Sequence, residues 1–165
     1  MDTKPRLVGQ LNGVRNLSEK ILSAFTTPEQ WVYQVHPQAN HALWFAGHIG
    51  LVDDFLVSAI AAEKPQQPEG YKEKFGMGSR PTSRPADYPA AETVLAFWRE
   101  RREALLKVLA GLSEDDLARP KPVGLPELFT DVASMFELAT RHEAMHAGQV
   151  TVARRALGHE PLRGG

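Results

Sequence analysis

Apolar residues recur at alternating three- and four-residue steps through four long stretches of this sequence, and this period constrains the fold most strongly. The stretches are residues 4–26, 41–63, 89–111 and 126–157. In an α-helix this spacing gathers the apolar side chains on one face, which a globular protein buries. No stretch alternates with the two-residue period of a strand. The sequence therefore predicts an all-α fold, a four-helix bundle that forms a single domain over residues 1–165.

The longest connection, residues 64–89, lies between the second and third predicted helices and follows no regular period. It contains five prolines, Pro65, Pro68, Pro81, Pro85 and Pro89. Loops of this length are uncommon in compact domains and often have a function. We expect this segment to cross from one end of the bundle to the other. A role as a lid or pocket wall is the less favoured alternative, and it is compatible with the crossover.

Two helix starts and one arginine carry specific expectations. Asn40 is expected to cap the second helix, and Pro126 is expected to open the fourth, because proline suits the first turn. Either Arg101 or Arg102 falls near the apolar face of the third helix. Such an arginine usually either extends its charged end to solvent or pairs with a carboxylate, and anion binding is the alternative.

Three histidines fall within the predicted apolar faces. His142 and His146 are four residues apart on the fourth helix, so their rings leave the same face one turn apart. His48 lies midway along the second helix, at a compatible depth in the bundle. Neutral imidazoles gain little from clustering in a dry core unless a cation binds them. We expect a metal site on His48, His142 and His146, against the alternative of core histidines bonded to neighbours.

Three nitrogen ligands would leave one or more positions on the ion open, as in catalytic sites. The ion would then activate a bound water or a substrate thiol. Gln149 lies one turn after His146 and is the candidate catalytic residue, as a group that orients a bound water or ligand. Its alternative role is a hydrogen bond between helices.

The other three histidines are expected to lie outside this site. His41 is two turns before His48, about 10 Å away, which is too far to share the ion. It is expected at the mouth of the pocket or simply in the first turn of its helix. His36 and His159 fall in predicted loops and are expected to be solvated.

Residues 142–146 also spell the His-Glu-x-x-His pattern of zinc proteases, in which Glu143 would be the general base. The extended pattern requires glycine and a further ligand where this chain has Gln149 and Val152. We therefore expect Glu143 at the rim or surface. Asp53 and Asp54 point away from the stripe of His48, which leaves no convincing carboxylate base on the inner faces.

The composition of the chain limits the classes of partner and the kinds of metal ligand that we expect. The net charge is −1 and the pI about 6.6, so no basic excess favours nucleic acid. No stretch approaches the roughly 18 consecutive apolar residues of a membrane helix, and the N-terminus lacks a signal-peptide core. We expect a cytoplasmic protein without a membrane partner. Because cysteine is absent, metal ligands must be histidine or carboxylate.

Two motifs give the chain a family resemblance. Leu43-Trp44-Phe45-Ala46-Gly47-His48-Ile49 is similar to the Trp-x-x-Gly-His-Leu element of the DinB-like (DinB/YfiT) superfamily of metal-binding bundles. Residues 142–150, with residues 154–158, are similar to that family's C-terminal His-x-x-x-His-x-Gly-Gln helix. The resemblance implies a four-helix bundle with a long crossover between helices two and three, frequently a homodimer. It also implies zinc or nickel on His48, His142 and His146.

Relatives of known activity in that superfamily include transferases and isomerases that use mycothiol, bacillithiol or glutathione. The resemblance therefore implies a metal-dependent enzyme, most simply a transferase acting with a low-molecular-weight thiol on a small-molecule substrate. Two alternatives remain open. One is a non-catalytic metal-binding module for stress response or dimerisation, and the other is a metal-activated small-molecule hydrolase. A shared fold does not decide among these functions.

Overall fold

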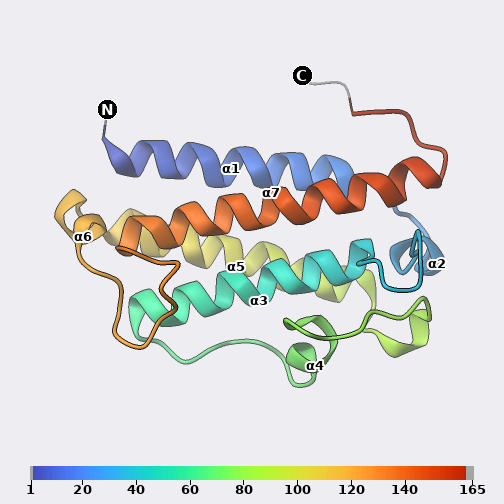
Figure 1. Ribbon diagram of the computed structural model, residues 1–165, viewed down its shortest axis with the longest axis horizontal. Coiled ribbons are helices and arrows are strands. Elements are labelled where there is room, and N and C mark those ends of the chain that lie inside the picture. The colour runs from blue at the N-terminus through green and yellow to red at the C-terminus, as the bar shows by residue number, and fades with distance from the viewer. Residues whose placement is uncertain (1, 163–165) are drawn as a thin grey trace.

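Four long helices form the body of the molecule, as predicted. The structure, a computed structural model, describes residues 2–162, and within this range it contains helices but no β-strand (Figure 1). The long helices are α1 (Thr3–Leu22), α3 (Ala42–Ala61), α5 (Ala91–Gly111) and α7 (Val132–Ala156). Short helices α2 (Pro28–Trp31) and α6 (Glu114–Ala118) lie in the connections before α3 and α7. The predicted all-α class is confirmed.

The order of the helices in space follows from the long connection. Helix α3 packs against α5 and α7, while α1 packs against α7 and α5. Residues 62–90 bring the chain back along the bundle, so that α3 and α5 run in the same direction (Figure 1). This connection contains α4 (Tyr71–Phe75) and a 3₁₀ turn at Pro85–Asp87. Tyr71 and Phe75 are buried, which fastens α4 to the bundle.

Helix α7 begins six residues later than predicted. Residues 126–131 are not helical, because the chain folds back here on residues 119–121. The Val132 amide donates to the Arg119 carbonyl at 3.0 Å, and Pro120 forms an isolated bridge with Asp131. Asp131 then caps the helix, its side chain accepting from the Ser134 amide at 2.8 Å. A capping box that follows a paired segment prevails here over the proline signal.

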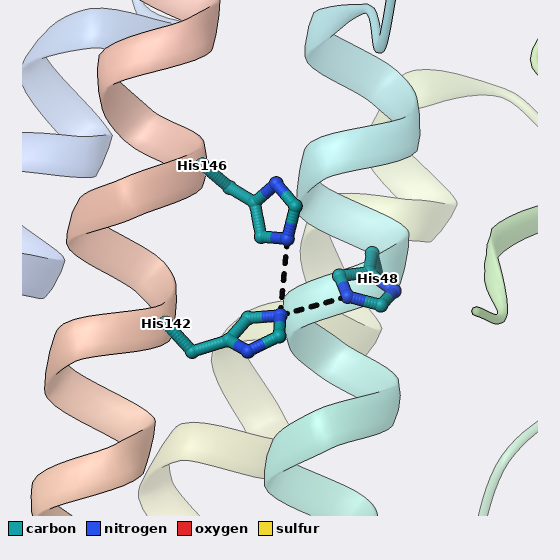
Figure 2. Close-up of side chains that lie close together, drawn as sticks. All are labelled: His48, His142 and His146. Carbon is teal, nitrogen blue, oxygen red and sulfur yellow. Dashed lines mark hydrogen bonds between the residues drawn. The ribbon is translucent and has the colours of Figure 1, made fainter.

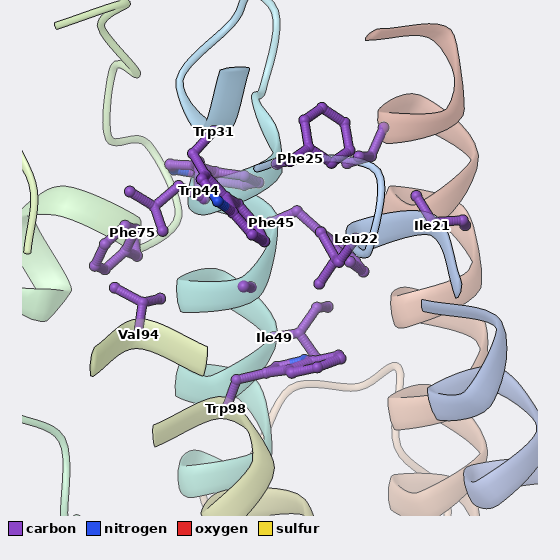
Figure 3. Close-up of a cluster of buried hydrophobic side chains, with 14 of the residues drawn as sticks. Ile21, Leu22, Phe25, Trp31, Trp44, Phe45, Ile49, Phe75, Val94 and Trp98 are labelled. Carbon is purple, nitrogen blue, oxygen red and sulfur yellow. The ribbon is translucent and has the colours of Figure 1, made fainter. Parts of the chain in front are cut away.

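The hydrophobic core has two parts. The first gathers aromatic residues where α2, α4 and the start of α5 meet α3, including Trp44, Phe45, Phe75 and Trp98 (Figure 3). The second fills the opposite half of the bundle around Leu56, Leu105 and Phe136. Burial does not follow the apolar period everywhere. Three residues that fit the three- and four-residue spacing are exposed: Leu17 at 43%, Phe55 at 44% and Leu128 at 54%.

A layer of four buried charged residues separates the two apolar clusters. Each long helix contributes one member: Arg15 from α1, Asp53 from α3, Arg102 from α5 and Glu143 from α7. Arg102 donates to Asp53 through Nε at 2.9 Å and to Glu143 through Nη2 at 2.7 Å. Arg15 donates to Asp53 at 3.0 Å and to Glu143 at 2.9 Å. We call these four residues the charged layer.

Further contacts complete the charged layer. Arg15 Nη1 donates to the Trp98 carbonyl at 2.8 Å, and Arg102 Nη1 donates to the Leu11 carbonyl at 3.0 Å. The Arg15 guanidinium also lies 3.9 Å from the centre of the Trp98 ring. Two positive and two negative charges thus balance, and each is hydrogen-bonded, which is the condition for tolerating charge in a core.

A second buried pair anchors the start of the crossover. Arg101 Nη1 donates to Asp54 at 3.1 Å, and the same carboxylate accepts from the Gln66 and Gln67 amides at 3.0 and 3.1 Å. Both arginines considered in the sequence are therefore buried and paired with carboxylates. The contacts match the carboxylate-pairing expectation for this position.

Helix α3 is the most apolar of the long helices. By length and composition alone it would suffice to cross a membrane, but 67% of its most apolar window is buried inside the bundle. His48, Asp53 and Asp54 interrupt its sequence and are themselves buried. These features are those of a central helix in a packed bundle.

Candidate metal centre

Three imidazoles from two helices meet between α3 and α7. The Nε2 atom of His142 lies 2.9 Å from Nε2 of His48 and 3.0 Å from Nε2 of His146 (Figure 2). One ligand atom from each residue lies within 4.8 Å of the others. The predicted convergence of His48, His142 and His146 is therefore present. Within residues 2–162 it is the cluster of histidines and carboxylates with the spacing of a metal site.

Hydrogen bonds on the far side of two rings fix their tautomers. The Nδ1 atom of His48 lies 2.8 Å from the Phe75 carbonyl oxygen, which can only accept, so Nδ1 carries the proton. The Nδ1 atom of His146 lies 2.9 Å from Gln149 Oε1, which also accepts from Asn40. In both neutral rings Nε2 consequently presents a lone pair to the centre.

Burial keeps these rings neutral near pH 7. Burial, with a smaller contribution from neighbouring histidines, lowers the pKa of His48 and of His142 to about 4, although the Phe75 carbonyl opposes the shift at His48 and Asp53 opposes it at His142. Burial also lowers the pKa of His146, partly opposed by its hydrogen bond to Gln149. Neutral imidazole is the form that binds metal ions.

Hydrogen bonds among the three neutral rings cannot account for both short contacts between their Nε2 atoms. Nε2 of His48 and of His146 both present lone pairs, and the neutral ring of His142 has one Nε2 proton at most. At least one of the two short nitrogen–nitrogen contacts therefore brings two nitrogens together with no hydrogen between them. A cation among the three atoms removes the conflict, since imidazole nitrogens bound to one zinc ion at about 2.1 Å lie about 3.0 to 3.4 Å apart. The residues present thus fit a divalent metal.

The three ligands differ in exposure. His48 and His146 are each 7% exposed, whereas His142 is only half-buried. The Trp44 ring stacks on His48, with centroids 4.4 Å apart and planes 12° from parallel, and meets His146 edge-on at 5.4 Å. The site is therefore closed on the Trp44 side and more open beside His142. A centre with three protein nitrogens and an open side can accept a further ligand.

Gln149 contacts both a candidate metal ligand and the segment before α3. It is an exposed residue, yet its Oε1 accepts from His146 Nδ1 and from Asn40 Nδ2 at 3.2 Å. It thus orients a candidate ligand and joins α7 to the segment before α3. Asn40 was expected to cap α3, but the cap is His41, whose Nδ1 accepts from the Trp44 amide at 3.0 Å.

The remaining histidines stay apart from the centre. His41 is fully buried beside Tyr88, with ring centroids 4.9 Å apart, rather than at a pocket mouth. His36 is exposed, and its Nδ1 accepts from the Gln38 amide at 3.2 Å. His159 follows α7 outside any helix. Neither loop histidine is part of the candidate centre.

The expectation that Glu143 lies at the rim was wrong, because Glu143 is fully buried in the charged layer. The expectation that Asp53 and Asp54 point away from the inner faces was also wrong, since both are buried. Each is paired with arginine, so neither is free to act as a base. A sequence signal existed: each member of the charged layer continues an apolar stripe at three- or four-residue spacing, as in Trp98-Arg102-Leu105. Read singly, each charge suggests a solvated face, and only the balanced set of four suggests burial.

Comparison with known proteins identifies the fold and the family. Residues 10–150 match the family model described as DinB superfamily. A solved structure, a conserved protein from Enterococcus faecalis, superposes with a TM-score of 0.74 at 17% sequence identity. The alignment covers 94% of this chain and 96% of that one. No curated protein matches the sequence.

Proposed function

Because this chain belongs to the DinB superfamily, we propose that it is a divalent-metal-dependent transferase that acts with a low-molecular-weight thiol. The observation that supports this proposal is the triad of Nε2 atoms, two of which are fixed as lone-pair donors. Zinc and nickel are the proposed ions, since imidazole ligands suit both.

A bound ion would lower the pKa of a substrate thiol and so hold it as the thiolate at neutral pH. The protein supplies the remainder. His48 and His146 are oriented by Phe75 and Gln149, and Trp44 covers one side of the rings. The half-buried ring of His142 marks the side from which a thiol and an electrophile would approach.

The carboxylates favour a thiol-dependent reaction over base-assisted hydrolysis. Hydrolysis by a metal-bound water usually needs a nearby general base. Glu143 is the candidate nearest in sequence, but it accepts from Arg15 and Arg102 and is closed off from solvent. Asp53 is engaged by the same two arginines. A thiol held as thiolate needs no such base.

The first test is the metal itself. Purified protein should contain about one equivalent of zinc or nickel, and a His142→Ala variant should lose it, because only two nitrogens would remain. His159→Ala, which alters a histidine outside the candidate centre, is the matched control and should retain the metal. Elemental analysis measures both, and equal metal content in the two variants would contradict the proposed site.

The second test concerns the thiol. Cobalt-loaded protein should develop a thiolate-to-metal charge-transfer band when glutathione or bacillithiol is added, and conjugation of an electrophile should require the metal. Metal binding without any thiol band would favour the non-catalytic module. Thiol turnover that persists in fully metal-free protein would refute a metal-dependent transferase.

A further inference from the structure

We infer that Gly47, Phe75 and Ser79 are positioning residues of the metal centre, so that the crossover connection forms its outer wall. The inference rests on the proposed metal site and adds residues outside the histidine triad. Phe75 and Ser79 lie in the connection between α3 and α5, far from α7 in sequence. Two separate contacts join this segment to the ligands, one through Phe75 and one through Trp44.

The first contact begins with the missing side chain of Gly47. A Cβ atom at this position would lie 2.4 to 2.7 Å from three atoms of the Phe75 ring, closer than any real contact. The glycine therefore lets the Phe75 ring rest directly on the backbone of α3. Glycine inside a helix costs about 1 kcal/mol relative to alanine, and this close approach is the structural reason for it.

The seated ring in turn aims the Phe75 carbonyl at His48. Phe75 is the last residue of α4, so its carbonyl is not used within that helix and is free to accept from Nδ1 at 2.8 Å. This bond sets both the tautomer and the ring angle of His48. A hydrogen bond of this kind is how proteins commonly orient a metal-binding imidazole.

The second contact passes through Trp44. Its indole Nε1 donates to the Ser79 hydroxyl at 2.8 Å, while its ring stacks on His48. Ser79 thus holds the ring that covers one face of the ligand. Between the two contacts lies Met77, which is 96% exposed, so the segment touches the site at its ends and projects outward in the middle.

A matched pair of glycine substitutions tests the first contact. Gly47→Ala should displace Phe75 and weaken zinc binding by about 10- to 100-fold, the usual effect of losing a group that orients a ligand. Gly50→Ala is the control, one turn later in α3, where a Cβ would lie 2.8 Å from the Phe97 ring on α5. Its zinc affinity should change by no more than about twofold, because it shares no partner with His48.

A milder pair tests the second contact without crowding the core. Ser79→Ala should weaken zinc binding by about three- to tenfold, the size of one net hydrogen bond. The control is Ser83→Ala, an exposed position in the same connection, and should have no effect. Zinc affinity is measured by competition with a chromogenic chelator, with thermal unfolding of the metal-free variants recorded in parallel.

A spectroscopic readout separates positioning from general destabilisation. In zinc-loaded wild-type protein, NMR of the imidazoles should show an Nδ1–H signal of His48 that exchanges slowly with water, because the Phe75 carbonyl accepts from it. Gly47→Ala should broaden or remove that slowly exchanging signal, while Gly50→Ala retains it. If Gly47→Ala and Gly50→Ala bind zinc equally well, or if both retain the signal, the positioning inference is overturned. If the wild-type protein binds no zinc, the proposed metal site itself fails.

Discussion

Glu143 stands next to a candidate metal ligand yet belongs to a different structure, the charged layer. Its two oxygens accept from Arg15 and Arg102 with no solvent exposure. Glu143→Gln keeps the shape but removes one negative charge, which leaves two buried arginines facing one aspartate. We expect it to lower the free energy of unfolding by about 3 kcal/mol or more, the usual cost of breaking a buried ion pair from one side.

The matched control for that substitution lies on the same helix. Glu137 pairs with Arg6 at 3.2 Å, and both side chains are more than a third exposed. Glu137→Gln should cost less than about 1 kcal/mol, as is typical of surface ion pairs. Urea unfolding measures both variants, and equal losses would mean that the charged layer contributes no more than a surface pair.

At the scale of residues, the sequence identified the histidines but not the rotation of each helix. The spacing of His142 and His146 fixed their shared face without any knowledge of neighbours. Leu17 and Phe55 also fit the apolar period, yet they are exposed. Their places inside are taken by polar groups such as Ser18 and Asp53, whose burial depends on partners from other helices. A pattern within one helix cannot reveal such partners.

The residue that caps the N-terminus of α3 should make the stability of the protein depend on pH. His41 caps the helix through Nδ1, and burial lowers its pKa from 6.5 to about 4. The unfolded chain therefore takes up a proton first as pH falls, and the native state loses stability between pH 6.5 and 4. His41→Asn should remove about 3 kcal/mol of this loss at pH 4.

Asparagine is a good capping residue, so the variant should keep the cap of α3. At pH 8 it should lose only the packing of the buried ring against Tyr88, a loss that does not change with pH. Denaturant unfolding of metal-free protein across this pH range measures the effect. An unchanged pH dependence in His41→Asn would show that the imidazole is not a source of acid sensitivity.

Element boundaries show what local signals can decide. The single turn α6 begins with a capping box between Ser113 and Asp116, a signal that lies entirely within the local sequence. The start of α7 was misplaced because two signals compete within six residues, Pro126 and Asp131. The decision depends on pairing of residues 119–121 with 130–132, which is a contact between segments and leaves no periodic mark in the sequence.

For the whole molecule, metal binding should raise the free energy of unfolding. An ion that binds only the folded state, present at about 100 times its dissociation constant, adds about 2.7 kcal/mol. For a chain of this size that corresponds to a rise in Tm of roughly 5–10 °C. Thermal unfolding with zinc should show this rise, and a chelator should reverse it.

His142→Ala provides the comparison, because it removes one of the three nitrogens but leaves the surface otherwise unchanged. Its Tm should respond little to zinc. If zinc raises the Tm of the variant as much as that of the wild type, the ion acts elsewhere on the protein.

The charged layer has a consequence for how the four helices can align. Each helix supplies a single charge at a fixed height, and each charge is met by partners from the others. If any one helix slid along its axis by one turn, about 5.4 Å, its charge would move among apolar side chains. The two opposite charges that contact it would each lose a partner. Apolar surfaces alone would permit several such axial shifts. The charged layer therefore selects one axial register of the four helices. The same register brings residue 48 level with residues 142 and 146.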